Sequence, residues 1–182
     1  MIAITSGVKD MQSVLNLIWD KLLPAMKSSA LAPDDEARKS LEQTLKGLSL
    51  RPLKGSGSSA KVSGKTYVFP ANERKLEAIT LETEDKGDTL VARFDGVERR
   101  VFCGRGTWLK GRAAWGQLAE QPAAASGAWS GDDTYTAKLC FYETPFIVTV
   151  NLKFSDDRVM LDSASNVGFG PNNQAQLVGK AE

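Results

Sequence analysis

The segment Ser58-Ser59-Ala60-Lys61 has the spacing S-x-x-K, in which a lysine one helical turn after a serine activates that serine as a nucleophile. This chemistry requires the serine at the start of a buried helix, and sites that use it carry further S-D-N or K-T-G motifs. Here the four residues lie in a stretch rich in Gly and Ser, and neither motif follows. We interpret the match as coincidental and expect no catalytic residue in this chain.

Two glycine-containing segments begin or end like nucleotide-binding motifs without completing them. Gly64-Lys65-Thr66 ends like a phosphate-binding loop, but the required Gly five positions before Gly64 is Ser59. Gly104-Arg105-Gly106 begins like a dinucleotide fingerprint, but the sixth position is Leu109 and no helical pattern follows. The chain has no His, and its 2 Cys residues lack metal-ligand spacing, so we predict neither a metal site nor a cofactor.

A basic stretch from Arg99 to Arg112 contains aromatic residues and no acid. Positive charge combined with stacking rings is one way to bind an anion or single-stranded nucleic acid. The whole chain is nearly neutral, however, with 23 Lys and Arg against 22 Asp and Glu, whereas nucleic-acid-binding domains are usually strongly basic. We favour a solvated strand face here, and nucleic acid is a disfavoured partner.

Several aromatic residues and one Arg are candidates for lining a ligand cavity. A β-barrel that binds an apolar molecule holds it among such side chains. The alternative, which we favour for the rings, is that they fill the core, because small barrels are usually filled by their own side chains. The candidate ligand-binding residues are Trp108, Arg112, Trp115, Trp129, Tyr135 and Tyr142.

The elements that must position these side chains fall into two regions of different composition. Of the 7 Phe, 4 Trp and 3 Tyr residues, only Trp19 precedes Tyr67. Residues 2–5 form a short strand candidate, and apolar residues then recur at helical spacing from Met11 to Met26, with Pro24 expected to limit or kink the last turn. A second helix is predicted from the Pro and acids at 33–36 through the stripe of Leu41, Leu45 and Leu48.

Beyond a Gly/Ser-rich stretch at 54–64, which indicates a linker, short runs of alternating polarity predict β-strands. The predicted strands span 66–69, 76–83, 89–94, 97–103, 134–142, 146–154, 158–162 and 174–178, with a further candidate at 108–115. Asp95-Gly96 fits a tight hairpin turn. Strands with one apolar face must close into a barrel or pack as a sandwich.

We therefore predict an α+β, mainly β fold, in which an antiparallel, lipocalin-like β-barrel of about 8–9 strands is preceded by two helices. The predicted domains are a strand and helical lead at 1–53, the linker at 54–64 and the barrel at 65–182. Cys103 and Cys140 lie in apolar, strand-like runs, which favours buried inert thiols over a disulfide. No apolar run approaches the ~18 residues of a membrane span, and no signal-peptide pattern opens the chain, so we expect no membrane partner. The sequence leaves the compartment open.

Both regions contain segments that resemble a known arrangement. Residues 2–7 and the helix at 14–26 resemble the last strand and C-terminal helix of bacterial beta-lactamase/penicillin-binding-protein-like serine hydrolases. Segments similar to the β-rich accessory region that follows the catalytic domain in many members are 63–67, 102–104, 126–129 and 141–145. The resemblance implies a non-catalytic accessory domain that packs on the catalytic domain or shapes access to it. The catalytic motifs of the family would then lie upstream of Met1.

An apolar face on the first predicted helix needs a covering surface, because such side chains are costly to leave in water. The resemblance implies that the catalytic serine hydrolase domain of the same parent chain supplies it; the alternative is self-association of this chain. The face comprises Val14, Leu15, Ile18 and Leu22. The leading prediction is thus a chain that is not an enzyme by itself. Two alternatives stay open, a lipocalin-like small-molecule-binding barrel and an anion or single-stranded nucleic-acid binder acting through 99–112.

Overall fold

The computed structural model describes residues 7–55, 57, 62–168 and 172–182. It divides into two compact units, a helical unit at Val8–Arg51 and a barrel unit that comprises Pro52–Glu182 with Gly7. The regular structure of the first unit is helical, and that of the second consists of β-strands.

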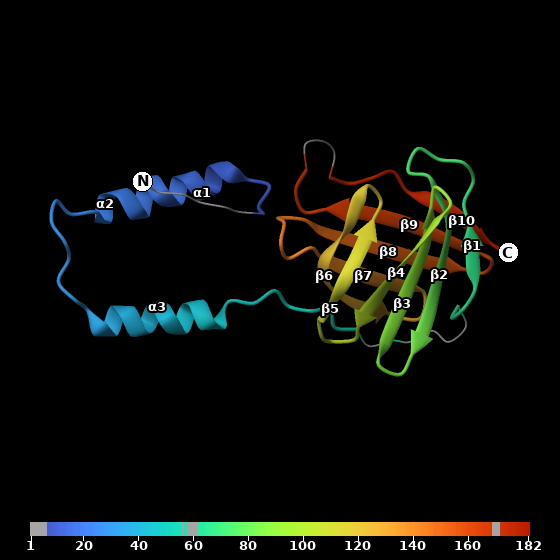
Figure 1. Ribbon diagram of the computed structural model, residues 1–182, viewed down its shortest axis with the longest axis horizontal. Helices are drawn as coiled ribbons and strands as arrows, with labels where there is room; N and C mark the ends of the chain where they lie inside the picture. Colours follow the sequence, from blue (N-terminus) through green and yellow to red (C-terminus); the bar gives the residue numbers. More distant parts are fainter. Residues whose placement is uncertain (1–6, 56, 58–61, 169–171) are drawn as a thin grey trace. The chain divides into compact units, whose positions relative to one another are not determined.

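The barrel unit contains ten strands hydrogen-bonded in the order β4-β3-β2-β1-β10-β9-β8-β7-β6-β5 (Figure 1). Neighbours in this order are antiparallel, and a parallel pairing of Gly104 with Ser126 joins β4 to β6, which closes a barrel of 9 strands with β5 paired to β6. The predicted helix-plus-barrel fold is therefore confirmed. The strands are β1 (Thr66–Val68), β2 (Leu76–Glu84), β3 (Gly87–Phe94), β4 (Val97–Gly104), β5 (Leu109–Trp115), β6 (Leu118–Ser130), β7 (Thr134–Cys140), β8 (Ile147–Ser155), β9 (Arg158–Ser165) and β10 (Leu177–Ala181).

Local sequence accounts for most of these strands and their turns. Asp95 and Gly96 have φ angles of +50° and +76°, the left-handed pair that a two-residue hairpin turn between β3 and β4 requires. In β8 the burial alternates strictly, with Val148, Val150 and Leu152 inward. Strands β9 and β10 are displaced from prediction, because β9 continues to Ser165 and β10 begins only at Leu177.

Strand β6 is the one strand that the sequence pattern did not predict. Its residues are mostly Ala, Gly, Ser and Pro, which have low strand propensity. The strand nevertheless lies between β5 and β7 and also meets β4, so that its middle, Ala123–Gly127, is buried. Small residues are needed there because a Cβ on Gly127 would lie 1.9 Å from the Tyr135 hydroxyl oxygen. Close packing overrides propensity at this strand.

Aromatic rings fill much of the barrel interior. Trp129 packs edge-on against Tyr135 with ring centroids 5.3 Å apart, and tilted against Phe154 at 5.6 Å. Tyr67 contacts the same Phe154 ring at 5.5 Å, and a separate edge-on pair joins Phe94 and Trp115 at 5.4 Å. Such pairs add to the stabilisation that burial of apolar area already provides.

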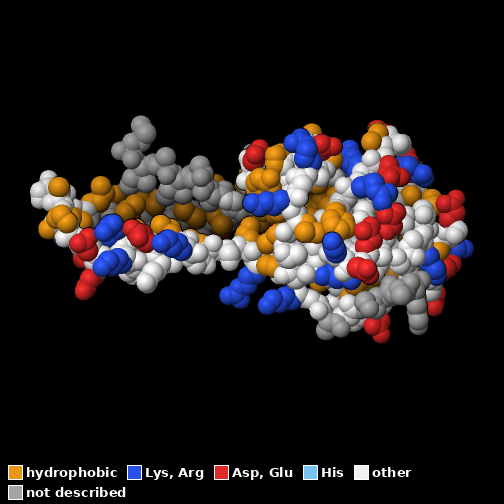
Figure 2. Space-filling view, turned by 60° about the horizontal axis from the view of Figure 1, so that its bottom comes forward, with side chains coloured by type: hydrophobic (Ala, Val, Ile, Leu, Met, Phe, Trp, Pro, Cys, Tyr) orange, Lys and Arg blue, Asp and Glu red, His pale blue; other side chains and the backbone are white. Residues whose placement is uncertain are grey.

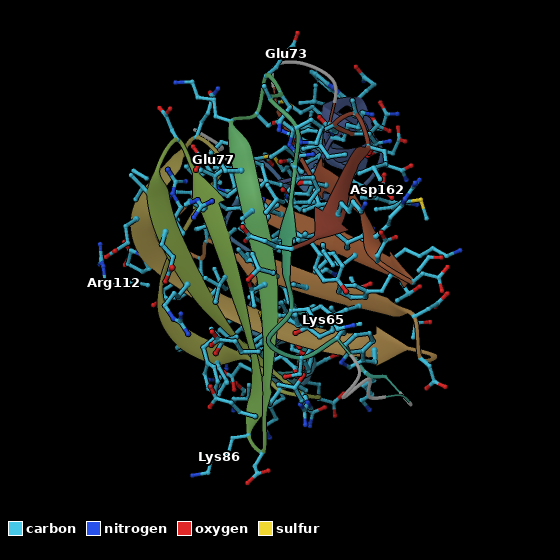
Figure 3. All side chains as sticks on the ribbon, turned by 90° about the vertical axis from the view of Figure 1, so that its right-hand side faces the viewer. Lys65, Glu73, Glu77, Lys86, Arg112 and Asp162 are labelled. Atoms are coloured by element: carbon cyan, nitrogen blue, oxygen red, sulfur yellow. The ribbon has the colours of Figure 1, made fainter. Side chains whose placement is uncertain are left out.

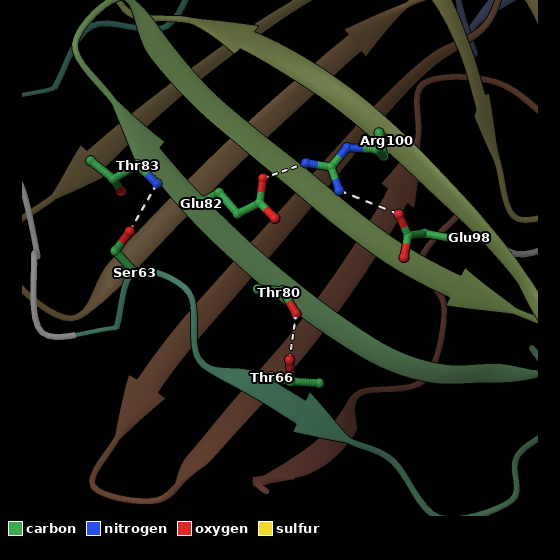
Figure 4. Close-up of polar contacts among 7 residues, drawn as sticks. All are labelled: Ser63, Thr66, Thr80, Glu82, Thr83, Glu98 and Arg100. Atoms are coloured by element: carbon green, nitrogen blue, oxygen red, sulfur yellow. Dashed lines mark hydrogen bonds and ion pairs between the residues drawn. The ribbon is translucent and has the colours of Figure 1, made fainter.

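The described part of the predicted linker, residues 54–55, 57 and 62–64, belongs to the barrel unit. Val62 is part of the core, and the Gly64 N–H donates to the Leu81 carbonyl at 2.9 Å. Ser63 accepts a hydrogen bond from the Thr83 N–H at 2.9 Å, and the Thr66 and Thr80 hydroxyls pair at 2.9 Å (Figure 4). The boundary between the units falls at Arg51 and Pro52. The predicted strand at 2–5 and the motif Ser58–Lys61 lie outside the described residues.

The helical unit contains two helices, as predicted. The first is formed by α1 (Met11–Leu17), the π-helical segment η1 (Ile18–Leu22) and α2 (Leu23–Ala25). The Asp10 side chain caps it by accepting from the Ser13 N–H at 3.2 Å. Pro24 lacks an N–H and its ring crowds the carbonyl four residues earlier, which accounts for the widened turn just before it and for the end of the helix at Ala25.

The second helix, α3 (Asp35–Gly47), has the local stabilisers of a solvent-exposed helix. The Asp34 carboxylate caps it by accepting from the Ala37 N–H at 2.8 Å. Arg38 forms ion pairs with Asp35 at 3.1 Å and Glu42 at 3.5 Å on the helix surface. Within the described residues, no helix has the length and apolar character that spanning a bilayer demands.

Candidate functional site

The six predicted ligand-binding residues lie in different environments. Trp115, Trp129 and Tyr135 are buried in the core, as the core-filling interpretation expected. Trp108 is half-buried. Arg112 points outward from the barrel wall and donates to the Glu120 carboxylate at 2.7 Å (Figure 3), and Tyr142 is 48% exposed. Trp129 and Tyr135 are brought together in ring contact, whereas Arg112 and Tyr142 lie outside the core.

The basic stretch at 99–112 is largely neutralised by groups of the barrel itself. Arg100 forms ion pairs with Glu82 and Glu98 (Figure 4). Arg99 donates to the Gly116 carbonyl and lies over the Phe94 ring at 5.2 Å. The remaining basic side chains of the stretch also have partners, Arg105 with Asp88, Arg112 with Glu120 and Lys110 with the Tyr142 ring. Little unpaired positive charge is left for a polyanion.

A buried polar cluster lies where β3, β4 and β7 meet the Gly127 region of β6. Asp88 is 0% exposed and receives two hydrogen bonds from the Arg105 guanidinium, 2.6 Å from Nη2 and 3.2 Å from Nε. These bonds raise the pKa of Arg105. Within the described residues, no group meets hydrogen-bond geometry with the buried Tyr135 hydroxyl, although Cys103 and Asp88 are its polar neighbours. Burial, followed by the negative charge of those neighbours, raises the pKa of Tyr135.

Both cysteines are free and buried, as predicted from the apolar runs that contain them. Burial raises the pKa of Cys103 to about 12, with a smaller opposing effect from Tyr135. Burial also raises the pKa of Cys140. Because the thiolate is the reactive form, these raised pKa values disfavour nucleophilic chemistry at both side chains near neutral pH. Among the described residues, no three His, Cys, Asp or Glu side chains gather as metal ligands.

A cavity opens at one end of the barrel, which we call the barrel mouth. It has a volume of about 760 Å³ and is lined by the loop before β2, the β5–β6 turn and the segment before β10. Its floor contains Phe94, Trp115 and Val148, which also belong to the hydrophobic core. Leu118 and Leu177 extend this apolar surface toward the rim. The apolar lining of the cavity is therefore continuous with the buried core.

A single arginine, Arg74, lines this mouth. Its side chain is half-buried, and Nη1 donates to the Ala175 carbonyl at 3.3 Å, joining the loop before β2 to the segment before β10. Burial lowers the pKa of Arg74, whereas the charge of Asp162 acts in the opposite direction. Asp162 accepts from Gln176 through both oxygens, at 3.1 and 3.2 Å. No carboxylate of the described residues forms an ion pair with Arg74.

The rim of the mouth also contains one carboxylate, Glu73, but it lies at the tip of its loop and points away from the barrel (Figure 3). Arg99 donates to the carbonyl of Gly116, a mouth-lining residue in the β5–β6 turn with a φ of +57°. Sequence reasoning found Trp115 but missed Arg74, because the position of Arg74 depends on Ala175, 101 residues further along the chain.

The helical unit has a different character, because no described residue in it is buried. Of the predicted apolar face, Val14 and Ile18 are half-buried, whereas Leu15 and Leu22 are 41% and 45% exposed. Figure 2 shows hydrophobic side chains at the surface of this unit beside its charged ones. Its exposed large apolar residues are Val8, Met11, Leu15, Leu17, Trp19, Leu22, Met26, Leu31, Leu41, Leu45, Leu48 and Leu50.

Comparison with known protein families, with curated proteins and with solved structures gives no significant match. The function must therefore be inferred from the residues of this chain. Two features stand out among them, the uncovered helical unit and the barrel mouth.

Proposed function

We propose that this chain is a non-catalytic accessory module of a beta-lactamase-like serine hydrolase and that its helical unit packs against the catalytic domain. The observation that carries the proposal is the helical unit, in which apolar side chains recur at helical spacing and none is buried. A helix of 13 residues such as α3 is marginal in water even with good caps. A stable helical unit therefore requires a covering surface.

A partner that covers the face formed by Val14, Leu15, Ile18 and Leu22 would stabilise the first helix. Full burial of one such side chain contributes about 1.5–3 kcal/mol, so four of them contribute on the order of several kcal/mol once a partner covers them. Residues 14–26 resemble the C-terminal helix of a serine hydrolase domain, and this resemblance supports the catalytic domain as the partner. In this proposal the first helix completes the catalytic domain, and the barrel is an accessory attached to it.

The chemistry of the barrel is consistent with a role without bond breaking. Among the described residues, the buried thiols have raised pKa values and Asp88 is held by Arg105. Neither arrangement presents a nucleophile beside a general base. The barrel supplies a rigid body and the helical unit supplies the attachment.

Light scattering and amide hydrogen exchange on the whole chain test this proposal. We expect a monomer in which the barrel amides are protected and the α1 to α3 amides exchange with little protection, because the partner is missing. Adding a separately produced catalytic domain of the proposed beta-lactamase-like class should then protect α1. A stable dimer with protected helical amides would contradict the proposal. If Leu22→Asp dissociated that dimer and the polar control Gln12→Asp did not, the apolar face of the first helix would instead be a self-association surface.

A further inference from the structure

The barrel mouth combines three features of a ligand site. Its volume of about 760 Å³ lies within the range of about 300–1,000 Å³ typical of sites for small organic molecules. Its floor is apolar and continuous with the core at Phe94, Trp115 and Val148. Apolar surface exposed in a concave site is favourable to cover with an apolar ligand group.

The third feature is the charge of Arg74. A guanidinium stays protonated at every physiological pH, and its planar donors match the two oxygens of a carboxylate. Arg74 is half-buried, and its hydrogen bond to Ala175 is a long one, at 3.3 Å, to a neutral carbonyl. The acid whose charge influences it, Asp162, is already hydrogen-bonded to Gln176. A partly desolvated cation to which the described residues supply no ion pair favours an anionic ligand group.

The other charged groups around the cavity do not cancel this preference. Glu73 is exposed and points away from the barrel (Figure 3). Arg99 lies next to the floor, over the Phe94 ring, and reinforces the positive sign of this end. The barrel mouth therefore has an apolar floor and, at Arg74, a positive charge on its rim.

From this arrangement we propose that the barrel mouth binds a small amphiphilic carboxylate, with its apolar part on Phe94 and Trp115 and its carboxylate on Arg74. This inference goes beyond the accessory role proposed above and does not depend on it, because the mouth belongs entirely to the barrel unit. A barrel that binds such a molecule can serve a serine hydrolase or act on its own.

Isothermal titration of the whole chain with three ten-carbon probes tests the charge preference. We expect decanoate to bind saturably below about 1 mM, and 1-decanol and decyltrimethylammonium to bind at least about tenfold more weakly, the factor that a charge-assisted hydrogen bond supplies. Arg74→Met, which keeps an apolar stem, should remove the preference for decanoate, whereas Arg74→Lys should retain most of it. Arg158→Met is the matched control, since Arg158 follows the β8–β9 turn, remote from Val148 at the mouth end of β8.

The position of the bound molecule is tested by tryptophan fluorescence. We expect decanoate to change the emission of the native chain and to leave that of Trp115→Phe nearly unchanged, because Trp115 is the Trp that lines the mouth. Circular dichroism confirms that each variant is folded. The proposal is overturned if no probe saturates, if the three probes bind equally, or if Arg74→Met binds decanoate as the native chain does.

Discussion

Replacement of Gly127 by Ala tests the packing where the barrel closes. An added Cβ would lie 1.9 Å from the Tyr135 hydroxyl oxygen, 2.6 Å from Cζ and 3.0 Å from the Cys103 Cβ. Non-bonded carbon and oxygen atoms need about 3.5 Å, so the Tyr135 ring must shift by roughly 1.5 Å. Tyr135 is fully buried against Trp129, and a shift of that size disturbs the core. We expect a loss of roughly 2–4 kcal/mol, at or above the upper end of usual overpacking costs.

A double-mutant cycle with Tyr135→Phe isolates the cause of that loss. Tyr135→Phe alone should change stability by no more than about 1 kcal/mol, because its hydroxyl has no hydrogen-bond partner in the described residues. In the Gly127→Ala background, Tyr135→Phe should restore about 1–2 kcal/mol of the free energy of unfolding. The second substitution removes the hydroxyl oxygen that the added Cβ meets first, but it leaves the ring carbon Cζ close to that Cβ. Equilibrium urea unfolding followed by tryptophan fluorescence measures each free energy.

The matched control is Gly111→Ala on the adjacent strand β5, where an added Cβ meets nothing within 4 Å. That change should be neutral or stabilise by up to about 1 kcal/mol, because Ala restricts the unfolded chain. If Gly127→Ala were as stable as Gly111→Ala, or if the cycle showed no coupling with Tyr135→Phe, the Tyr135 ring would not be what requires a glycine at the barrel closure.

Three further predictions concern other parts of the chain. Asp88→Asn should lower the free energy of unfolding, measured in urea, by about 1–3 kcal/mol. This loss is smaller than for a fully buried ion pair, because the Arg105 side chain is 38% exposed. The control Asp95→Asn, in the exposed pair with Lys75, should lower it by less than about 0.5 kcal/mol. The raised pKa of Cys103, about 12 against the ordinary 9.0, means that between these values the unfolded thiol loses its proton and the folded one keeps it. Stability should therefore fall with rising pH above about 9, by up to about 1.4 kcal/mol per pH unit from this group, and the fall should be shallower in Cys103→Ala. Asp34→Ala, which removes the α3 cap, should lower helicity measured by circular dichroism without shifting the urea midpoint of the barrel.

The sequence pattern predicted strands wherever one face of a strand carries large apolar residues. Tyr135, Ala137 and Leu139 on β7 alternate with polar residues, and their burial follows that alternation. Strand β6 escaped prediction because its inward residues are small, and they are small because Tyr135 of another strand needs the space. A requirement set by a neighbouring strand leaves no periodic signal in the strand that meets it.

The candidate sites, too, could be predicted from sequence only where their residues are neighbours in the chain. The apolar face at Val14, Leu15, Ile18 and Leu22 is local in sequence, and helical spacing alone predicts it. The barrel mouth joins Arg74, Trp115 and Leu177 from distant parts of the chain, and only the pairing order of the strands brings them together. Asp88 likewise gives no local sign of burial, since its partner Arg105 lies across the β3–β4 hairpin.

The two units differ in how completely their charged and apolar side chains are paired or buried within the unit. The side chains left unpaired or uncovered indicate where the chain interacts with other molecules. On the barrel, strand-face charges such as Arg93, Arg100 and Arg112 are paired with acids of adjacent strands, and Figure 2 shows both signs interspersed on the visible face. A surface neutralised in this way offers little to a charged partner. The helical unit leaves large apolar side chains uncovered, and in the part of the chain that the structure describes no acid forms an ion pair with Arg74 at the mouth. A macromolecular partner is therefore expected at the helices and a small anionic molecule at the mouth, two interactions that separate mutations, Leu22→Asp and Arg74→Met, should abolish independently.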